Sequence, residues 1–191
     1  YWIMKGEKMI DKTIPYVKFQ MERNTTQALP DRQLPEGYQV SFYTPGDERD
    51  WQVIETSVGE FDHLSEAQRY FQKSFAPYPD ELAKRMTFVT DPSGKKVATC
   101  TAWWAKEGGP QFHWLAVMRE AQRKGIATFL TVKVTALLEE LYPDQPAMLH
   151  TQTWNYPAIT IYQKLGYTFV SGTKDFEKGM SILKDIVRRE D

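Results

Sequence analysis

The chain of 191 residues has few of the side chains that disulfides and metal sites need, with one cysteine and three histidines. A single cysteine, Cys100, excludes an internal disulfide and a cysteine-rich zinc site. His63, His113 and His150 are too far apart in the sequence to show the spacing of metal ligands. We therefore expect no bound metal.

Common nucleotide-binding signatures are also missing. No Gly-Lys-Ser/Thr follows a glycine-rich loop, so the sequence lacks a P-loop. The glycine pattern of dinucleotide-binding folds is absent as well, and no carboxylate pair suggests a magnesium site. These absences weigh against a phosphotransferase that binds ATP.

A strong net charge and a long hydrophobic run are both lacking. The formal net charge is −1, so no global field attracts nucleic acid or an anionic membrane. No apolar run approaches the roughly 20 residues that a membrane span needs. Residues 1–8 also lack the apolar stretch of a signal peptide. We therefore expect a cytoplasmic protein with no nucleic-acid or membrane partner.

What the chain does contain is the patterning of an ordinary globular domain, with 41% hydrophobic and 26% charged residues. Alternation and short apolar runs predict strands at residues 17–21, 38–43, 86–90, 96–104, 111–118, 147–153, 167–171 and 180–187, and the last of these also fits a short helix. Helical spacing predicts helices near residues 47–58, 65–75, 79–85, 126–141 and 155–165. A capping box formed by Ser65 and Gln68 is expected to begin the second helix.

This order of elements predicts the α/β (α+β) class, with a single mixed central sheet and flanking helices. Residues 38–191 are expected to form the domain, and residues 1–37 an N-terminal extension with one strand and a loop. The strand at 17–21 could extend a sheet or reach a second subunit. A homodimer is therefore one expected assembly.

The most informative segment runs from Val117 to Ala127 and reads VMREAQRKGIA. It joins the end of a predicted strand to the first turn of the longest predicted helix, through a loop that contains Gly125. The first N–H groups of a helix have no partner inside it, and the helix dipole makes this end positive. The segment predicts a site for a phosphate or pyrophosphate, although a plain strand-to-helix turn fits the spacing as well.

A second motif follows the strand at 147–153 and reads Asn155-x-x-Ala158-x-x-x-Tyr162-x-x-x-Gly166-Tyr167. Together with the first motif, Val-x-x-x-x-Gln-x-x-Gly-x-Ala, it resembles the GNAT-type N-acetyltransferase family. The resemblance covers roughly residues 38–187 and is sharpest over residues 112–167.

Three residues of the first motif depart from the family pattern. Arg119 stands where proline is common, Ala121 where an aromatic residue is common, and Arg123 where glycine is common. The backbone N–H of Arg123 can still serve a phosphate, and the charge of its side chain favours one.

The resemblance implies the acyl-CoA N-acyltransferase (GNAT) fold and an acyltransferase that uses acetyl-CoA as its acyl donor. The implied acceptor is a primary amine, on a small molecule or on a peptide or protein. The acetyl group would pass directly to it in a ternary complex. We do not expect Cys100, which precedes the loop motif, to carry the acyl group. A longer acyl donor stays open, and the alternative function is a non-catalytic acyl-CoA-binding sensor or regulatory module.

The resemblance also implies which residues hold the cofactor. Backbone N–H groups from Arg123 to Thr128 would bind the pyrophosphate, and Val117 and Arg119 would pair with the pantetheine arm where two parallel strands splay apart. The Val117 N–H would also stabilise the oxyanion, an interaction worth about 3 kcal/mol. The full set is Val117, Met118, Arg119, Gln122, Arg123, Lys124, Gly125, Ile126, Ala127, Thr128, Asn155 and Tyr162.

Tyr162 is the predicted catalytic acid. A thiol has a pKa of about 8.5 and a phenol of about 10, so a tyrosine stays protonated at neutral pH and can protonate the leaving sulfur. Such assistance is typically worth about 10²–10⁴-fold. The alternative is an aromatic core residue beside Ile159, Ile161 and Leu165.

His113 is the predicted base, because the substrate amine must lose a proton to attack. Residues at even spacing share a face of a regular strand, so His113, Leu115 and Val117 are expected to point the same way. The alternative is a hydrogen-bonded structural histidine. His150, on the neighbouring predicted strand, is a weaker candidate.

Two further groups of residues could shape the acceptor pocket. An acidic group near the second helix could favour a cationic amine or could simply be a solvated face: Glu60, Asp62, Asp80 and Glu81. An aromatic group on two adjacent strands fits either sheet packing or a pocket wall: Trp103, Trp104, Phe112 and Trp114.

Overall fold

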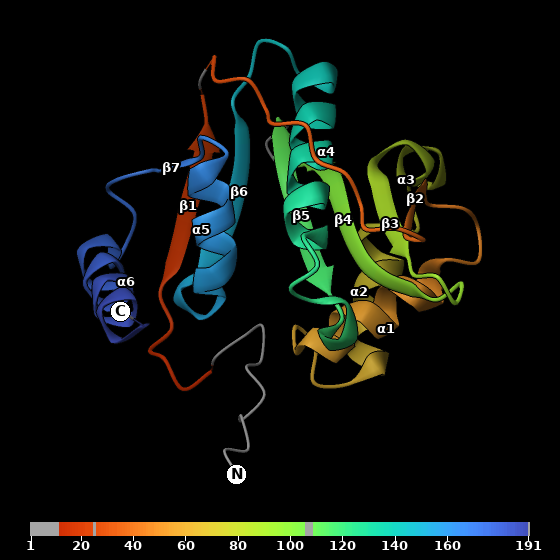
Figure 1. Cartoon of the computed structure of the whole chain (residues 1–191), viewed down its shortest axis with the longest axis horizontal. Coiled ribbons are helices and arrows are strands. Elements are labelled where there is room, and N and C mark those ends of the chain that lie inside the picture. Colours follow the sequence, from red (N-terminus) through yellow and green to blue (C-terminus); the bar gives the residue numbers. More distant parts are fainter. Residues whose placement is uncertain (1–11, 25, 106–108, 191) are drawn as a thin grey trace.

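The computed structural model of the chain describes residues 12–24, 26–105 and 109–190 (Figure 1). The strands in these residues are β1 (Lys18–Arg23), β2 (Gln39–Phe42), β3 (Met86–Thr90), β4 (Lys96–Trp104), β5 (Pro110–Val117), β6 (Ala147–Gln152) and β7 (Thr168–Phe169). The helices are α1 (Glu48–Val58), α2 (Leu64–Ser74), α3 (Pro79–Arg85), α4 (Ile126–Leu141), α5 (Tyr156–Lys164) and α6 (Phe176–Glu190). Two short 3-10 turns precede α4 and α5, namely η1 (Arg119–Ala121) and η2 (Thr153–Asn155).

The seven strands form one sheet in the order β2-β3-β4-β5-β6-β1-β7. Neighbouring strands are antiparallel except β5 and β6, which are parallel. The predicted mixed sheet with flanking helices is therefore confirmed. β1 comes from the predicted N-terminal extension, of which residues 1–11 and 25 lie outside the described residues, and it pairs with both β6 and β7.

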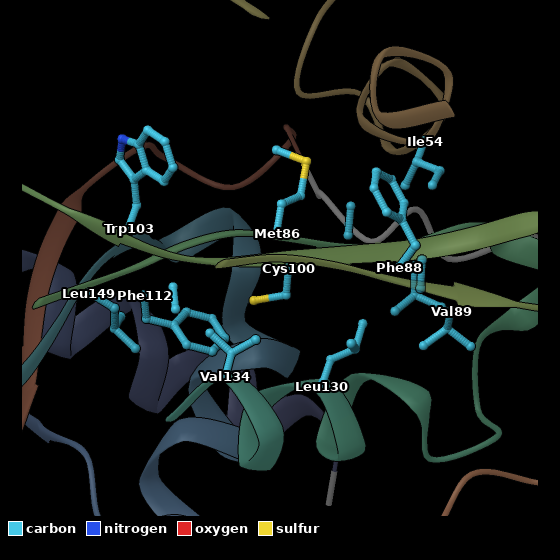
Figure 2. Close-up of a cluster of buried hydrophobic side chains, with 14 of the residues drawn as sticks. Ile54, Met86, Phe88, Val89, Cys100, Trp103, Phe112, Leu130, Val134 and Leu149 are labelled. Atoms are coloured by element: carbon cyan, nitrogen blue, oxygen red, sulfur yellow. The ribbon is translucent and has the colours of Figure 1, made fainter. Parts of the chain in front are cut away.

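Helices cover both faces of the sheet. Figure 2 shows Ile54 of α1 above the strands and Leu130 and Val134 of α4 below them, with buried side chains of the strands between. In Figure 1, α5 lies on the same side as α4, and α1 and α2 lie behind the sheet. We refer to these two sides as the α1/α2 face and the α4/α5 face.

A cluster of aromatic rings fixes α1 and α2 to the sheet. Trp51 of α1 is fully buried, and its ring lies 5.5 Å from that of Phe71, 6.0 Å from that of Tyr70 and 5.6 Å from that of Trp114. Aromatic pairs at such distances contribute beyond the apolar area that they bury. The helices that border the site described below are therefore held by large, rigid contacts.

β5 contains a β-bulge at its centre. His113 pairs with Thr101 and Ala116 pairs with Thr99, so two residues of β5 lie opposite one residue of β4. Trp114, inside the bulge, has a φ of 54°, which is unusual for a bulky side chain. Directly paired residues of antiparallel strands share a face, and the extra residue therefore changes which residues of β5 do so.

The predicted common face of His113 and Val117 is consequently wrong. Val117 pairs with Ala98, and Phe112 pairs with Ala102. Both therefore point to the α4/α5 face, where Figure 2 shows Phe112. His113 points to the opposite face. Alternation breaks at the bulge, so even spacing no longer means a shared side.

β5 and β6 separate along their length. Their parallel pairing extends only over Gln111–Phe112 and Met148–Leu149. Figure 1 shows the part of the sheet with β6, β1 and β7 diverging from the part with β5 in the lower half of the view. The expected splay between these two strands is present, and it starts beside His113.

Two predictions differ from the structure for a reason that the contacts show: the cap of α2 and the type of element at residues 180–187. The helix expected to begin at Ser65 begins at Leu64, because the Glu66 carboxylate accepts the backbone N–H groups of Asp62 and His63, each at 3.2 Å. That carboxylate replaces the predicted Ser65–Gln68 pair as the N-terminal cap. Residues 180–187, expected as a strand with a short helix as the alternative, belong to helix α6.

Helix α6 forms because its apolar residues recur at helical spacing and face the sheet. Phe176, Met180 and Leu183 pack against the core. Gly179 lies so close to β1 that an added Cβ would come within 2.5 Å of the Phe19 ring. The segment is therefore amphipathic, and its packing decides in favour of the helix.

Candidate active site

A cavity of about 710 Å³ lies where β5 and β6 separate. Its lining brings together three predicted site residues that are far apart in the sequence, His113, Asn155 and Tyr162. The remaining residues that line it are Glu60, Tyr70, Lys73, Ser74, Tyr78, Trp103, Trp104, Ala105, Gln111, Phe112, Trp114, Leu115, His150, Thr151 and Gln152.

The cavity connects the two faces of the sheet. Phe112 points to the α4/α5 face, and its ring lies 5.5 Å from that of Tyr162. His113 points to the α1/α2 face, where it contacts Tyr70 of α2. Because all four residues line one cavity, the opening passes between the two strands. A ligand entering from each face could meet the other at this place.

Tyr162 lies on α5 with its side chain 6% exposed. Burial is the main reason why the pKa of its phenol lies well above the ordinary value, and nearby Cys100, Tyr167 and Glu60 raise it further. No hydrogen bond joins the Tyr162 hydroxyl to another residue in the described ranges. The phenol thus keeps its proton at neutral pH and faces the cavity with it.

His113 is joined by a hydrogen bond to a tyrosine hydroxyl. The Trp114 indole N–H donates to the Tyr70 hydroxyl at 3.2 Å, and that hydroxyl lies 3.2 Å from His113 Nε2. Because a hydroxyl can accept two hydrogen bonds, the tautomer of His113 decides whether the hydroxyl donates to Nε2 or accepts from it. Burial, and then the nearby His150, lower the pKa of His113 to about 4. His113 is therefore neutral across the physiological range.

Glu60, between α1 and α2, lies against the start of α5. The Asn155 side-chain amide donates a hydrogen bond to the Glu60 carboxylate and lowers its pKa, but burial has the larger effect and leaves the pKa above the ordinary value. The contact links the α1/α2 face to α5 beside the cavity. Asn155, predicted as a cofactor ligand, is thus in contact with a carboxylate from the opposite side.

The predicted pyrophosphate loop lies outside the cavity lining, at the start of α4. Gly125 is the residue before the helix, with a φ of 81°, and the first intrahelical bond runs from Phe129 N–H to the Gly125 carbonyl. The N–H groups of Ile126, Ala127 and Thr128 precede that bond and have no acceptor in the helix. Arg123 also has a positive φ, of 60°. This end of α4 therefore presents N–H groups and a positive dipole, as an anion site requires.

Val117 connects this loop to the strand gap. Met118 N–H donates to Val97 O at 2.8 Å. Because bonded and non-bonded pairs alternate along antiparallel strands, the backbone groups of Val117 point away from β4 and toward the gap. The Val117 carbonyl accepts the Gln122 side chain at 3.0 Å, which leaves the N–H directed at the gap.

Residues 49–167 match the family model described as Acetyltransferase (GNAT) family. This match spans more than half of the chain. The protein belongs to the GNAT family. The predicted family and fold are confirmed.

Solved structures share the fold at low sequence identity. A GCN5-related N-acetyltransferase from Sphaerobacter thermophilus has a TM-score of 0.65 and 20% identity, over 82% of this chain and 49% of that chain. An acetyltransferase of the GNAT family from Colwellia psychrerythraea has a TM-score of 0.61 and 10% identity, over 82% of this chain and 54% of that chain. A GCN5-related N-acetyltransferase from Kribbella flavida has a TM-score of 0.55 and 16% identity, over 85% of this chain and 61% of that chain.

The chain spans less than two thirds of each of these three proteins. At such identities the likeness concerns the fold alone. No curated protein matches the sequence.

Two residues of the candidate site were not singled out from the sequence. Tyr70 falls within the helix predicted at residues 65–75, and its hydroxyl bonds both Trp114 and His113. Glu60 was considered only as one of several acidic residues that could shape the acceptor pocket. Neither belongs to a sequence motif, and each reaches the cavity because α2 and the loop before it pack over the bulge of β5. A polar group on the apolar face of α2 was the one available signal.

The other titratable candidates are less suited to the chemistry. His150 lines the cavity, and its Nδ1 lies 3.2 Å from the Gln111 amide nitrogen. Burial raises the pKa of the Cys100 thiol well above the ordinary value, which makes it a poor nucleophile. Among the described residues, no three His, Cys, Asp or Glu side chains gather so that they could hold a metal ion. No helix in the described part of the chain is long and apolar enough to cross a membrane.

Proposed function

We propose that this GNAT protein transfers an acetyl group from acetyl-CoA to a primary amine by direct transfer in a ternary complex. The observation that carries the proposal is the single cavity through the sheet, in which the phenol of Tyr162 meets residues of the α1/α2 face. Family membership supports acyl transfer. The arrangement of Tyr162, Val117 and the start of α4 supports acetyl-CoA as donor.

The residues at the start of α4 fit the pyrophosphate of coenzyme A. The N–H groups of Ile126, Ala127 and Thr128 have no acceptor in the helix, and the dipole adds to their attraction for an anion. The exposed side chains of Arg119, Arg123 and Lys124 surround this place. When bound, acetyl-CoA supplies an acetyl group activated as a thioester.

Two groups of the chain act on the developing charges. The Val117 N–H, directed at the strand gap, would stabilise the negative charge that develops on the thioester carbonyl oxygen. One such hydrogen bond is worth about 3 kcal/mol in a dry site. The Tyr162 hydroxyl would donate its proton to the sulfur as the carbon–sulfur bond breaks. The raised pKa of Tyr162 keeps this proton available at neutral and mildly alkaline pH.

His113 and Tyr70 offer a route for the proton that leaves the amine. In the tautomer with the imidazole proton on Nδ1, the Tyr70 hydroxyl would accept that proton while it passes its own to His113 Nε2, which lies 3.2 Å away. With a pKa of about 4, His113 would hold the proton only briefly before water takes it. The base role thus belongs to the pair and not to the histidine alone.

The test is steady-state release of coenzyme A thiol from acetyl-CoA in the presence of a panel of amines, together with calorimetric binding of coenzyme A. Amine-dependent thiol release, and amide product in equal amount, support the proposal. Tight coenzyme A binding with no thiol release for any amine would instead support a non-catalytic sensor. A matched Tyr162→Phe sample shows whether the measured release depends on the site.

A further inference from the structure

The cavity is elongated, and ring contacts give the order of the residues along it. At one end, which we call the inner end, Phe61 stacks on Trp114 with ring centroids 5.3 Å apart. At the other, the outer end, the Tyr78 ring lies 6.0 Å from that of Trp103, and Trp103 pairs with Gln111 of β5. Helix α2 lies between Phe61 and Tyr78 in the chain. It therefore runs beside β5 from one end of the cavity to the other.

Two elements measure the length of the cavity. Its lining includes β5 from Gln111 to Leu115, and four steps of about 3.3 Å along a strand cover about 13 Å. Helix α2 has 11 residues and, at about 1.5 Å per residue, a length of about 16 Å. A ligand that fills the space between these walls is therefore more than about 10 Å long, because both walls extend at least that far.

The acyl group would be transferred at the inner end. Val117, whose N–H is assigned to the thioester oxygen, lies beyond Leu115 on β5. The Tyr162 hydroxyl is near enough to Glu60 for the carboxylate charge to contribute to its raised pKa, and Glu60 comes directly before Phe61. The acceptor amine must therefore reach the inner end to react.

Side-chain contacts cross the cavity at this inner end. The Asn155 amide donates to the Glu60 carboxylate, and Lys12 Nζ lies 3.5 Å from Asp62 Oδ1 and 5.9 Å from the centre of the Trp154 ring. Both contacts join the loop before α2 to η2 or to the chain segment that packs on it. The tyrosine at the outer end, in contrast, is 46% exposed. An acceptor therefore enters from the outer end, with its amine first.

The charge and polarity of the lining narrow the class of acceptor. Glu60 is its one carboxylate among the described residues, and the positive charge of Lys12 already acts on that group. The second ammonium group of a polyamine would thus lie in the cavity without a free carboxylate partner, which costs binding energy. Ser74 and Gln152 also line the cavity, and an alkyl chain would offer their polar groups no hydrogen bond. A peptide backbone offers both donors and acceptors.

We propose that the acceptor is the N-terminal amine of an extended peptide, which fills the cavity with its first four residues. Four extended residues span about 13 Å. An internal lysine does not fit, because its side chain is only about 6 Å long and a chain that carried it deeper would have to continue past the contacts at the inner end. This inference rests on the proposed function, since it names the acceptor of the same site.

The first experiment uses the full chain at saturating acetyl-CoA with C-terminally amidated alanine peptides of one, two, four and six residues. We expect kcat/KM to rise by about tenfold or more from one residue to four, because each residue adds contacts along the cavity. From four residues to six it should change less than about twofold, since the added residues lie outside.

Two other amines complete this comparison. An N-terminally acetylated alanine peptide with a central lysine, and spermidine, should each have a kcat/KM about tenfold or more below that of the four-residue peptide. Use of alanine amide, of the blocked lysine peptide or of spermidine that equals use of the four-residue peptide would overturn the inference while leaving acetyl transfer intact.

A variant that shortens the cavity tests the path of the peptide. Ser74 lines the cavity and precedes Phe75, whose ring lies 6.1 Å from that of His113 and 5.0 Å from that of Trp103. Ser74→Phe should therefore lower the activity ratio of the four-residue peptide to alanine amide to about twofold or less, and Ser74→Ala should retain the ratio. An unchanged ratio in folded Ser74→Phe would contradict the proposed path.

Ser65→Phe is the matched control. Ser65 is an exposed position on the same helix, and it does not line the cavity, so the ratio should equal that of the wild type. Calorimetry without acetyl-CoA separates the two proposals. If the four-residue peptide amide binds about tenfold more tightly than alanine amide, the inference is supported even if no amine is acetylated. Equal or absent binding together with no turnover would overturn it along with the proposed function.

Discussion

Tyr162 is the side chain on which the proposed chemistry depends most. Tyr162→Phe removes the hydroxyl and keeps the ring that packs on Phe112. We expect kcat to fall by about 10²–10⁴-fold with the affinity for coenzyme A unchanged. Steady-state kinetics and calorimetry measure both. Because burial raises the phenol pKa, loss of its proton should not lower wild-type kcat below about pH 10. An unaltered kcat in the variant would remove the acid role.

His113 gives a second prediction, on pH dependence. A lowered pKa means that the imidazole is protonated only below about pH 4. Its titration should therefore produce no acid limb of kcat/KM between pH 5 and pH 8. Histidine side-chain NMR spectra should show one residue with a midpoint of about 4, identified by its loss in His113→Asn. A midpoint near 6.5 would contradict the burial of the His113 imidazole that lowers its pKa.

Glu55 of α1 is a buried carboxyl that the proposed mechanism does not use. Neither of its carboxyl oxygens has a hydrogen-bond partner in the described part of the chain, and burial raises its pKa well above the ordinary value of 4.5. The folded state holds this proton at pH values where the unfolded chain has lost it. Glu55 therefore makes the protein less stable as the pH rises from 4.5 toward the folded-state pKa.

The matching variant is Glu55→Gln, which cannot ionise. Its melting temperature should exceed that of the wild type by a margin that grows from pH 4 to pH 8. Thermal unfolding at several pH values measures this margin. Glu140→Gln, an exposed position on α4, serves as the control and should show no such growth. A margin independent of pH would mean that Glu55 is ionised in the folded protein.

Among the elements, the start of α4 combines a backbone requirement with a binding role. Gly125 has a φ of 81°, and an added Cβ would meet nothing within 4 Å. Gly125→Ala should therefore lower the free energy of unfolding by about 1–2 kcal/mol, because alanine disfavours the left-handed conformation. A loop that changes its conformation to relieve this strain should also bind coenzyme A more weakly.

Gly94 offers a matched control for this prediction. It also has a positive φ, of 89°, and open space around its missing Cβ, but it lies in the turn between β3 and β4. Gly94→Ala should lose a similar amount of stability and bind coenzyme A as the wild type does. Chemical denaturation and calorimetry compare the two variants. Equal affinities in both would show that the Gly125 loop does not hold the cofactor.

The elements themselves were largely predictable from local patterns. Apolar spacing predicts the long helix before Tyr142 and the strands β3 to β6, because their side chains face a core directly. The β5 bulge was not predictable, since one additional residue leaves no mark on composition and yet moves Val117 to the other face from His113. The cap of α2 is a local contact, made by Glu66 in place of the predicted Ser65–Gln68 pair. The helical form of α6 depends on a tertiary contact, its packing against β1.

In the whole molecule, the site is assembled from segments that are far apart in the sequence. Family resemblance predicted the residues of the α4 loop and of α5, and the structure brings Asn155 and Tyr162 together with His113 at the strand gap. It did not distinguish Glu60 from the other acidic residues and did not indicate Tyr70, because these reach the cavity only through the packing of α1 and α2 around Trp51. The residues proposed for the cofactor thus come from motifs, whereas these two residues of the α1/α2 face are identified only by the fold.

The central claim is direct transfer of an acetyl group to an amine across the gap between β5 and β6. Acetyl-CoA labelled in its acetyl group, incubated with the protein and an amine that supports thiol release in a rapid-quench experiment, tests it most directly. We predict that the label moves from coenzyme A to the amine nitrogen, with none attached to the protein at any time. Label that stays on coenzyme A, or that becomes bound to the protein before the amide forms, would contradict the account.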